Sequence, residues 1–341
     1  MTQRPVVIAA PEPRTLDLIF RPERLADLRA AYDVHEVAAD RLGDLPAEVL
    51  AAARYVIGQP PIDADLLVRM ERLACVFNVE GNLFLNMPYP RLFERGIHVV
   101  TTMEVFARPV AEIGLGLALD LLRGITDADL AFRHGHEAWG LDGNARARLL
   151  TGADVGLIGF GGIGRSLLPL LQPFRPRLRI HDPWLPPSVI AEAGAEAVSL
   201  DTLLETSDVI FGLAAVTDEN EGFLGADAFA RMQPGATFVL LSRAGVVDFD
   251  ALIEAVARGH IRAASDVFPE EPMPPGHPVR SLPGFLRSAH RAGALDTAFK
   301  AMGDMVLEDM ALMDRGLPPL RCKRAERETV ARMRSKPVKK S

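Results

Sequence analysis

Short apolar runs alternate with amphipathic segments over the first part of the chain. Strands are predicted at residues 6–9, 34–37, 55–58, 74–78 and 98–101, and helices at 23–31, 46–53 and 63–72. Strands that alternate with helices are typical of a parallel sheet covered by helices on both faces. The first part of the chain is therefore expected to form one α/β domain.

A second and more regular alternation begins at residue 154. Its predicted strands span residues 154–159, 178–182, 208–213, 236–241 and 261–266, and its helices include 200–205 and 249–257. This order is typical of a doubly wound nucleotide-binding sheet. The apolar stretch 105–122 is predicted to be a helix that connects two domains, since Glu112 and Asp120 interrupt it and exclude a membrane span.

These patterns predict an α/β fold with two doubly wound parallel-sheet domains. Residues 105–294 would form a Rossmann domain. The helical run at 294–313 is long enough to pack back on the first domain. Residues 1–104 and 295–320 would then form a discontinuous, flavodoxin-like substrate domain.

Composition adds limits on location and partners. The chain has 341 residues and only two cysteines, and its N-terminus lacks the apolar region of a secretion signal, so we expect a soluble protein of the cytoplasm with no membrane partner. Residues 321–341 carry nine Lys and Arg against two Glu, a net charge of +7, whereas the first 320 residues sum to −14. We expect this basic tail to be flexible and solvated, and we expect no nucleic-acid partner.

A glycine-rich turn lies between the strand predicted at 154–159 and a helical run that continues to residue 171. Gly159 would permit the tight turn, Gly161 would let the backbone approach a pyrophosphate, and Gly164 would let the helix pack closely on the strand. Free N–H groups at the start of the helix would bind the anion. The pattern predicts dinucleotide binding, although such turns also occur in flavoproteins and methyltransferases. The turn consists of Gly159, Phe160, Gly161, Gly162, Ile163 and Gly164.

An aspartate ends the next predicted strand. Asp182 lies 18 residues beyond Gly164, where a carboxylate accepts hydrogen bonds from the adenosine ribose and repels a 2′-phosphate. NAD is therefore the expected cofactor, rather than NADP. Two residues at the ends of later strands join the expected cofactor-binding set: Ala214 and Leu241.

Three further motifs stand at the ends of later strands. They are Ser-Arg-Ala-Gly-Val-Val-Asp at 242–248, Asp-Val-Phe-Pro-Glu-Glu-Pro at 266–272 and Ser-Ala-His-Arg-Ala-Gly at 288–293. With the glycine turn and the segment 107–112, they make the chain resemble the D-isomer-specific 2-hydroxyacid dehydrogenases over roughly residues 70–315. The resemblance implies hydride transfer between NAD(H) and a small 2-hydroxy or 2-oxo acid. It also implies a homodimer that pairs through the NAD-binding domain.

By this resemblance Arg243, Glu271 and His290 occupy the catalytic positions, and each has a chemical reason to be there. An arginine can hold a 2-oxo acid through a bidentate fork and polarise its carbonyl group. A histidine can protonate the new alkoxide in reduction and accept the proton in oxidation. A glutamate beside it would orient the imidazole and favour its charged form. The resemblance also puts Asp266 near the nicotinamide amide and its ribose.

The chain departs from the family in the loop that should bind the substrate carboxylate through backbone N–H groups. This loop typically reads Gly-x-Gly before an acidic residue, but Asn78 and Glu80 replace the two glycines here. The expected substrate-binding residues are Val79, Glu80 and Gly81, together with Arg243. Because Glu80 adds a negative charge there, either Glu80 points away or the substrate is not a simple acid. The sequence therefore assigns no particular substrate.

Two other interpretations stay open. Corepressors of this fold use NAD to control assembly, and the basic tail and Glu80 are compatible with such an NAD-sensing role with little or no turnover. The chain could also be a different Rossmann protein in which the Arg, Glu and His are incidental. His134, His136 and Glu137 lie in a polar connection and are expected to face solvent, so no metal site is predicted.

Overall fold

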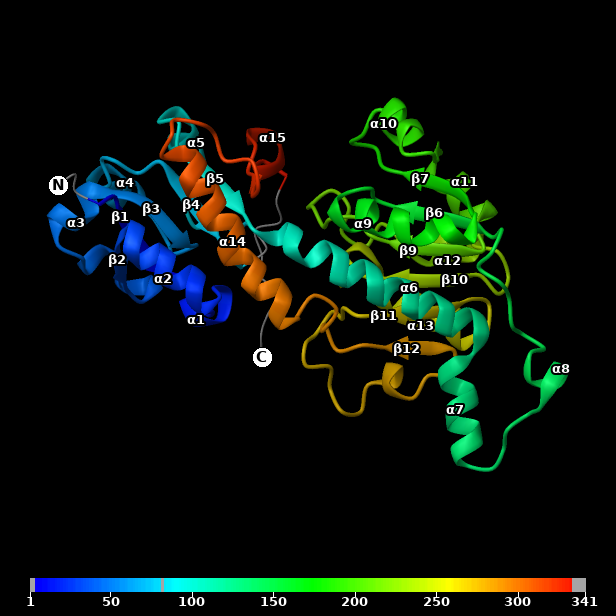
Figure 1. Cartoon of the computed structure of the whole chain (residues 1–341). Coiled ribbons are helices and arrows are strands. Elements are labelled where there is room, and N and C mark those ends of the chain that lie inside the picture. Colours follow the sequence, from blue (N-terminus) through cyan, green and yellow to red (C-terminus); the bar gives the residue numbers. More distant parts are fainter. Residues whose placement is uncertain (1–3, 81–82, 333–341) are drawn as a thin grey trace. The chain divides into compact units, whose positions relative to one another are not determined.

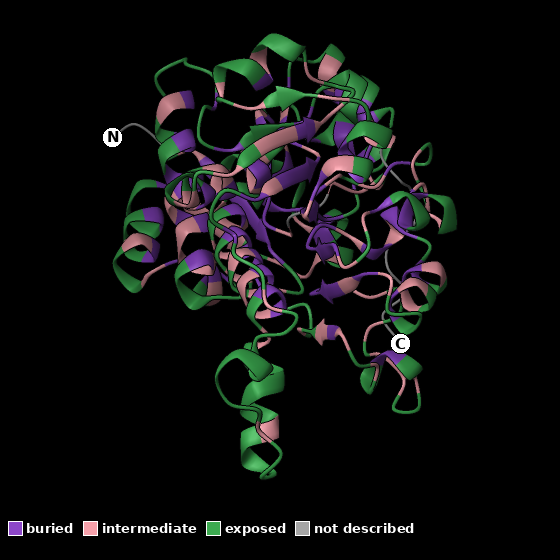
Figure 2. Cartoon of the chain, turned by 90° about the vertical axis from the view of Figure 1, so that its right-hand side faces the viewer, coloured by how far each residue is buried: buried purple, intermediate pink, exposed green. Residues whose placement is uncertain are grey.

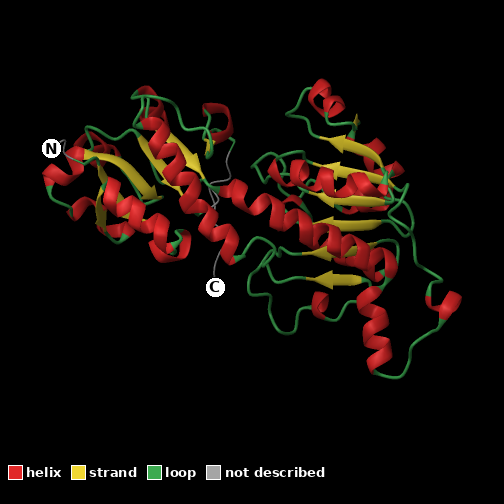
Figure 3. Cartoon of the chain, in the orientation of Figure 1, coloured by secondary structure: helices red, strands yellow, loops and turns green. Residues whose placement is uncertain are grey.

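The computed structural model describes residues 4–80 and 83–332, and these divide into two compact units. The first unit contains residues 4–106 and 294–332, and the second contains residues 107–293. Each unit has one sheet of mainly parallel strands with helices packed against it (Figures 1 and 3). This confirms the α/β class predicted from the alternation of strands and helices.

The first unit is built on a six-stranded sheet in the order β13-β5-β4-β3-β1-β2. Five strands are parallel, and the edge strand β13 is antiparallel to β5. The strands are β1 (Val6–Ala10), β2 (Asp33–Glu36), β3 (Ala53–Gly58), β4 (Cys75–Asn78), β5 (His98–Thr101) and β13 (Lys323–Arg324). The helices are α1 (Leu16–Ile19), α2 (Pro22–Ala31), α3 (Ala47–Ala52), α4 (Ala64–Arg69), α5 (Tyr89–Glu94), α14 (Asp296–Met313) and α15 (Arg327–Val330), with 3₁₀ turns at Ala39–Asp44 and Met103–Phe106.

Side chains of the strands alternate between two apolar layers, as the two-residue period of a strand requires. Along β1, Val7 and Ala9 pack with α1, α2 and α14 on one face. Val6 and Ile8 pack with α3, α4 and α5 on the other. The buried sheet explains why β1 reads as a continuous apolar run rather than an alternating one.

The expectation of a flexible tail from residue 321 onward is wrong for its first half. Cys322, Ala325 and Val330 are buried, and β13 pairs with β5. The buried carboxylate of Asp309 holds this segment, because it accepts backbone N–H groups from residues 320, 321 and 322. The apolar residues of this segment are therefore buried, while the basic residues between them are exposed. Residues 333–341 lie outside the described residues.

The second unit is built on a seven-stranded parallel sheet in the order β12-β11-β10-β9-β6-β7-β8. The strands are β6 (Asp154–Ile158), β7 (Arg177–His181), β8 (Glu196–Ala197), β9 (Val209–Gly212), β10 (Thr237–Leu240), β11 (Arg262–Ser265) and β12 (Phe285–Arg287). The helices are α6 (Ala107–Arg123), α7 (Ile125–Arg133), α8 (Gly140–Gly143), α9 (Gly162–Leu171), α10 (Pro187–Glu192), α11 (Leu200–Thr206), α12 (Ala226–Arg231) and α13 (Phe249–Ala257), with 3₁₀ turns at Gln172–Phe174, Ala244–Val246 and Pro278–Arg280.

The chain reverses its direction of strand addition between β6 and β9. From β6 it adds β7 and β8 on one side, and then returns to add β9 to β12 on the other. Helices α6 and α9 pack together, and α6 also contacts β10 and β11. Open α/β sheets bind ligands beside such a switch point, outside the carboxyl ends of the strands.

A helical projection follows α6. Helix α7 and the short α8 extend from the sheet, and nearly all of their residues are exposed (Figure 2). Within the described part of the chain, none of the helices has the length and apolar character that a bilayer crossing needs.

Candidate active site

The predicted glycine turn joins β6 to α9 at the switch point. Gly159 has a φ of +96°, and a Cβ there would lie 2.8 Å from the backbone N of Ala214. A Cβ on Gly164 would lie 3.0 Å from the carbonyl oxygen of Gly159. A side chain at Gly159 is therefore excluded both by backbone conformation and by the approach of the β9 end.

The middle of the turn is open to a ligand. A Cβ on Gly161 would meet no other atom within 4 Å. Gly161 is the N-cap of α9, and no side chain caps this helix end. Gly162 and Ile163 then begin the helix, so its first N–H groups are available to donate hydrogen bonds to the oxygens of a pyrophosphate. Open space and unused donors are the features that a dinucleotide phosphate group needs.

Phe160 contributes to the turn mainly through packing. Its side chain is buried, and the Arg165 guanidinium lies 4.8 Å from its ring centre. Its backbone N–H donates to Oδ2 of Asp182 at 2.8 Å. Of the residues expected to bind the cofactor, Phe160 thus fixes the shape of the turn and holds the aspartate at the end of β7.

Asp182 follows β7 directly and is partly exposed. Its Oδ1 accepts the backbone N–H of Trp184 at 3.0 Å, while its Oδ2 accepts that of Phe160. Each carboxylate oxygen can accept more than one hydrogen bond. The two backbone donors therefore orient the carboxylate and leave acceptor capacity for a ribose hydroxyl.

The two apolar residues expected at the cofactor differ in their surroundings. Ala214 lies against Gly159 at the switch point. Leu241 is buried, and its side chain packs on α6 so closely that a Cβ on Gly114 would lie 2.3 Å from it. The Leu241 side chain is thus part of the core behind the site.

His290 and Glu271 form the closest polar pair of the predicted catalytic residues. Nδ1 of His290 lies 2.6 Å from Oε2 of Glu271, a hydrogen-bonding distance. The other oxygen, Oε1, accepts the backbone N–H of Phe268 at 2.9 Å, which fixes the carboxylate. With Nδ1 engaged, Nε2 is the ring nitrogen left to exchange a proton with a ligand.

The loop that carries His290 is held by Asp266, at the end of β11. The Asp266 carboxylate is buried and accepts the backbone N–H groups of Arg291 and Ala292, both at 3.1 Å. The N–H of His290 donates to the Asp266 carbonyl oxygen at 2.7 Å. His290 itself has a φ of +49°, a conformation that costs energy for a residue with a side chain. Asp266 therefore holds the histidine in a strained backbone conformation.

Arg243 lies just beyond the end of β10, partly buried. Its guanidinium donates to the Ser242 carbonyl oxygen at 2.7 Å. Burial lowers the pKa of Arg243, and the negative charge of Glu271 opposes that shift. The three predicted catalytic residues thus interact as one group at the carboxyl end of the sheet, since Glu271 acts on both His290 and Arg243.

The altered loop of the first unit follows β4. Val79 is fully buried and its side chain belongs to the core of the first unit, so it offers no exposed surface to a ligand. The N–H of Glu80 donates to Oδ1 of Asn78 at 2.6 Å, which engages a donor that the family resemblance assigned to the substrate. The Glu80 carboxylate lies 4.0 Å from Nε of Arg14. Gly81, the remaining predicted substrate-binding residue, lies outside the described residues.

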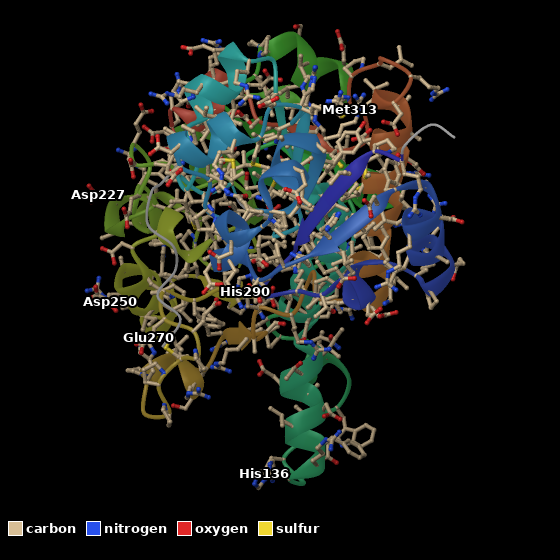
Figure 4. All side chains as sticks on the ribbon, turned by 90° about the vertical axis from the view of Figure 1, so that its left-hand side faces the viewer. His136, Asp227, Asp250, Glu270, His290 and Met313 are labelled. Atoms are coloured by element: carbon tan, nitrogen blue, oxygen red, sulfur yellow. The ribbon has the colours of Figure 1, made fainter. Side chains whose placement is uncertain are left out.

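Arg14 is a residue that the sequence patterns did not single out. It stands 66 residues from Glu80 in the chain, and no local motif links the two. By contrast, the histidines at 134 and 136 are exposed, and Figure 4 shows His136 at the tip of the α7 projection. Among residues 4–80 and 83–332, no three His, Cys, Asp or Glu side chains gather as metal ligands would.

Known proteins resemble this chain in sequence. The family model of the D-isomer specific 2-hydroxyacid dehydrogenase NAD-binding domain matches residues 115–292. A glyoxylate reductase from Aeropyrum pernix is 30% identical over 310 residues, which cover 87% of this chain and 91% of that protein. A D-3-phosphoglycerate dehydrogenase from Methanocaldococcus jannaschii is 30% identical over 75% of this chain and 48% of its own length. This chain thus spans about half of that longer relative.

Solved structures resemble the whole chain. A phosphoglycerate oxidoreductase from Rhizobium etli has 61% sequence identity and a TM-score of 0.89, with coverage of 95% of this chain and 99% of that one. An apo D-mandelate dehydrogenase from Rhodotorula graminis shares the fold, with a TM-score of 0.80 at 20% identity.

Proposed function

This chain belongs to the D-isomer specific 2-hydroxyacid dehydrogenases and is an NAD-dependent oxidoreductase, and we propose that it reduces a 2-oxo acid with Arg243, Glu271 and His290 as its catalytic group. The observation that carries the proposal is the pair of His290 and Glu271, 2.6 Å apart. Arg243 stands at the end of the neighbouring strand β10, and the negative charge of the Glu271 carboxylate acts on it as well. These are a proton donor, its partner and a carbonyl-polarising cation.

The glycine turn and Asp182 fit the cofactor. The open space at Gly161 and the uncapped start of α9 suit a pyrophosphate, and Asp182 suits an unphosphorylated ribose. Bound NADH supplies the hydride for reduction. The tasks left to the protein are to bind the acid, polarise its carbonyl group and deliver one proton.

Arg243 performs the first two tasks. Its planar fork can donate to a carboxylate oxygen and to the carbonyl oxygen of the same 2-oxo acid. The partly desolvated guanidinium strengthens both bonds, because electrostatic attraction grows as water is excluded. Negative charge that develops on the carbonyl oxygen is thereby stabilised.

His290 delivers the proton through Nε2, while Nδ1 keeps its bond to Glu271. The Glu271 carboxylate stabilises the protonated ring and fixes its orientation. In the oxidative direction the same nitrogen takes the proton from the hydroxyl group. Asp266 holds the histidine loop in place and acts as a positioning residue.

A substrate panel tests this function. The purified protein is mixed with NADH and a series of 2-oxo acids, and NADH oxidation is followed by absorbance. We expect turnover with at least one acid, and a loss of several hundredfold or more in His290→Ala. NADH binding without turnover across the panel would favour an NAD-sensing role instead.

We further propose that the chain forms a homodimer through the α7 projection of the NAD-binding unit. Phe132 and Trp139 are exposed and touch edge to face, with ring centres 6.4 Å apart, and Leu130 and Leu141 are exposed nearby in the chain. Exposed aromatic residues of this kind commonly mark a protein interface. Phe132→Asp should shift the sedimentation coefficient from dimer to monomer, and a monomeric wild type would contradict the proposal.

A further inference from the structure

Two arginines meet at the end of the second sheet where its strands begin, beside the start of the α7 projection (Figure 1). Arg262 is the first residue of β11, and Arg148 lies on the segment that returns from α8 to β6. The N–H of Arg262 donates to the Ala236 carbonyl oxygen at 2.9 Å. The Arg148 guanidinium donates to the Pro234 carbonyl oxygen at 3.5 Å, a long hydrogen bond. Both arginines are therefore held at the turn that leads into β10.

A third arginine adds its charge to this place. Nη2 of Arg262 donates to the carbonyl oxygen of Arg146 at 3.0 Å, and the side chain of Arg146 is exposed. Burial lowers the pKa of Arg262, and the positive charges of Arg148 and Arg146 lower it further. Asp127, in the first turn of α7, opposes this shift, but it acts on Arg287 as well. Positive charge thus exceeds negative charge around Arg262.

The guanidinium groups of Arg262 and Arg148 lack acceptors. Each guanidinium has five N–H donors. Among the described residues, the Arg262 guanidinium donates only to the Arg146 carbonyl oxygen. In the same part of the chain, the Arg148 guanidinium has only its long bond to Pro234, because Oδ1 of Asp208 lies 3.9 Å from Nη1. Arg148 is 45% exposed, so an anion can approach it from solvent.

The sheet beside Arg262 is polar as well. Thr237 pairs with Arg262 in register, and paired residues of parallel strands point to the same face of a sheet. Thr237 is fully buried, and its hydroxyl group has no hydrogen-bond partner among the described residues. A buried polar group without a partner is unfavourable. An apolar occupant would leave these donors unpaired, so the occupant that fits carries oxygen atoms.

We propose that Arg148 and Arg262 bind a phosphate group, as free phosphate or as a phosphate ester, at the end of the second sheet that is remote from the catalytic group. A phosphate group carries up to two negative charges at neutral pH and at least three acceptor oxygens, so it can pair with two guanidinium groups at once. A carboxylate has one charge and two oxygens, which a single arginine fork satisfies. The site is distinct from the glycine turn, which lies at the carboxyl end of β6.

A phosphate group held by both arginines joins two parts of the second unit. Arg262 belongs to the sheet, whereas Arg148 belongs to the segment that returns from the α7 projection. The backbone of Arg148 is also tied to the end of α6, because its N–H donates to the Leu122 carbonyl oxygen at 2.9 Å. Bound phosphate should therefore hold the base of the projection and slow amide hydrogen exchange in residues 144–150.

The test is a calorimetric titration of the NADH-loaded protein with inorganic phosphate, at an ionic strength kept constant with chloride. NADH fills the glycine turn, so phosphate does not bind there. We expect one phosphate site per chain with a Kd of about 1 mM or tighter, and acetate should bind about 10-fold more weakly or less. Methyl phosphate is titrated in parallel. Tighter binding of methyl phosphate identifies an ester as the preferred ligand, tighter binding of phosphate identifies the free ion, and both results support the proposal.

Arg148→Met and Arg262→Met remove one charge each and keep an apolar stem. Each should raise the Kd for phosphate by about 10-fold or more, the usual effect of losing a charged hydrogen bond, without changing the Kd for NADH. Arg258→Met is the matched control, because Arg258 is exposed at the end of α13 and pairs with Glu254 instead. It should bind phosphate as the wild type does. If Arg262→Met does not fold, the exposed Arg148 decides.

The proposal is overturned if the NADH-loaded wild type binds no phosphate, or if acetate binds as tightly. It is also overturned if the folded Arg148→Met and Arg262→Met variants keep the wild-type Kd, or if saturating phosphate leaves the exchange of residues 144–150 unchanged, since both results indicate an adventitious ion only. None of these measurements depends on the acid that the enzyme reduces.

Discussion

Replacing Glu271 by Gln removes the negative charge beside His290 while the size of the side chain is kept. The new amide oxygen can still accept the Phe268 N–H, so the loop should keep its shape. The protonated imidazole, however, loses its carboxylate partner. We expect kcat for reduction to fall, while the binding of NADH is unchanged because Glu271 does not belong to the glycine turn.

The size of the effect follows from the distance and the exposure of the pair. Two unit charges about 4 Å apart attract each other by about 4 kcal/mol at an effective dielectric constant of about 20. The His290 side chain is 44% exposed and that of Glu271 26%, so water screens part of this attraction. A net loss of about 1.5–3 kcal/mol, the usual range for a charged hydrogen bond, corresponds to a fall in kcat of about 10- to 150-fold.

The assay is steady-state NADH oxidation with the best acid of the panel, together with an NADH fluorescence titration. Glu270→Gln is the matched control, because Glu270 precedes Glu271 and is exposed. The reasoning is refuted if Glu271→Gln keeps the wild-type kcat, or if the control loses as much. If Glu271→Gln lost NADH affinity by as much as it lost kcat, the loop would have collapsed. In that case Glu271→Asp, which keeps the negative charge, decides: it should recover part of the activity that Glu271→Gln loses if the charge matters.

Three further predictions concern the cofactor site and the stability of the second unit. Asp182→Ala should raise KM for NADH and reduce the ratio of kcat/KM with NADH to kcat/KM with NADPH by about 10-fold. Parallel kinetics with both cofactors measures this ratio, and an unchanged ratio would contradict the role of Asp182 in selecting NADH. Gly159→Ala should lower the free energy of unfolding, measured by urea titration, by more than about 2 kcal/mol, because Gly159 has a φ of +96° and lies against the end of β9. Gly116→Ala is the control and should cause no such loss, because a Cβ there meets no atom within 4 Å. Hydrogen bonds from Arg177 and a second arginine lower the pKa of Asp154 from 3.8 to about 2, so its contribution to stability is present above pH 4 and is lost as the pH falls toward 2. Asp154→Asn should therefore be less stable than the wild type at neutral pH, with a gap in urea midpoints that closes between pH 4 and pH 2; a constant gap would contradict the assignment.

The sequence predicts the parts of this fold that local pattern determines. Strand β6, the glycine turn and helix α9 follow one another because the apolar run, the glycines and the helical period all agree. The two-residue β8 and three-residue β12 were not predicted, since such short strands form only by pairing with a neighbour. The sequence does not predict the burial of the segment that contains Cys322 and Ala325 for a related reason: its charges dominate the composition, whereas its few apolar residues determine its burial.

The same division applies to the candidate site. The motifs at the ends of β10, β11 and β12 indicate Arg243, Glu271 and His290, because the fold brings the carboxyl ends of parallel strands to one edge. The contact of Arg14 with Glu80 joins residues far apart in the chain and has no local pattern. The strained φ of His290 is likewise imposed by Asp266, a tertiary contact. The sequence could therefore raise the question of the Glu80 charge but not supply its partner.

The central claim is that Arg243, Glu271 and His290 act on one 2-oxo acid. A crystal structure of the protein with NADH and oxamate, an unreactive analogue of such acids, tests this most directly. We predict oxamate oxygens within about 3 Å of both the Arg243 guanidinium and Nε2 of His290, with Nδ1 still bonded to Glu271. Oxamate bound away from Arg243, or an imidazole turned from it toward solvent, would contradict the claim.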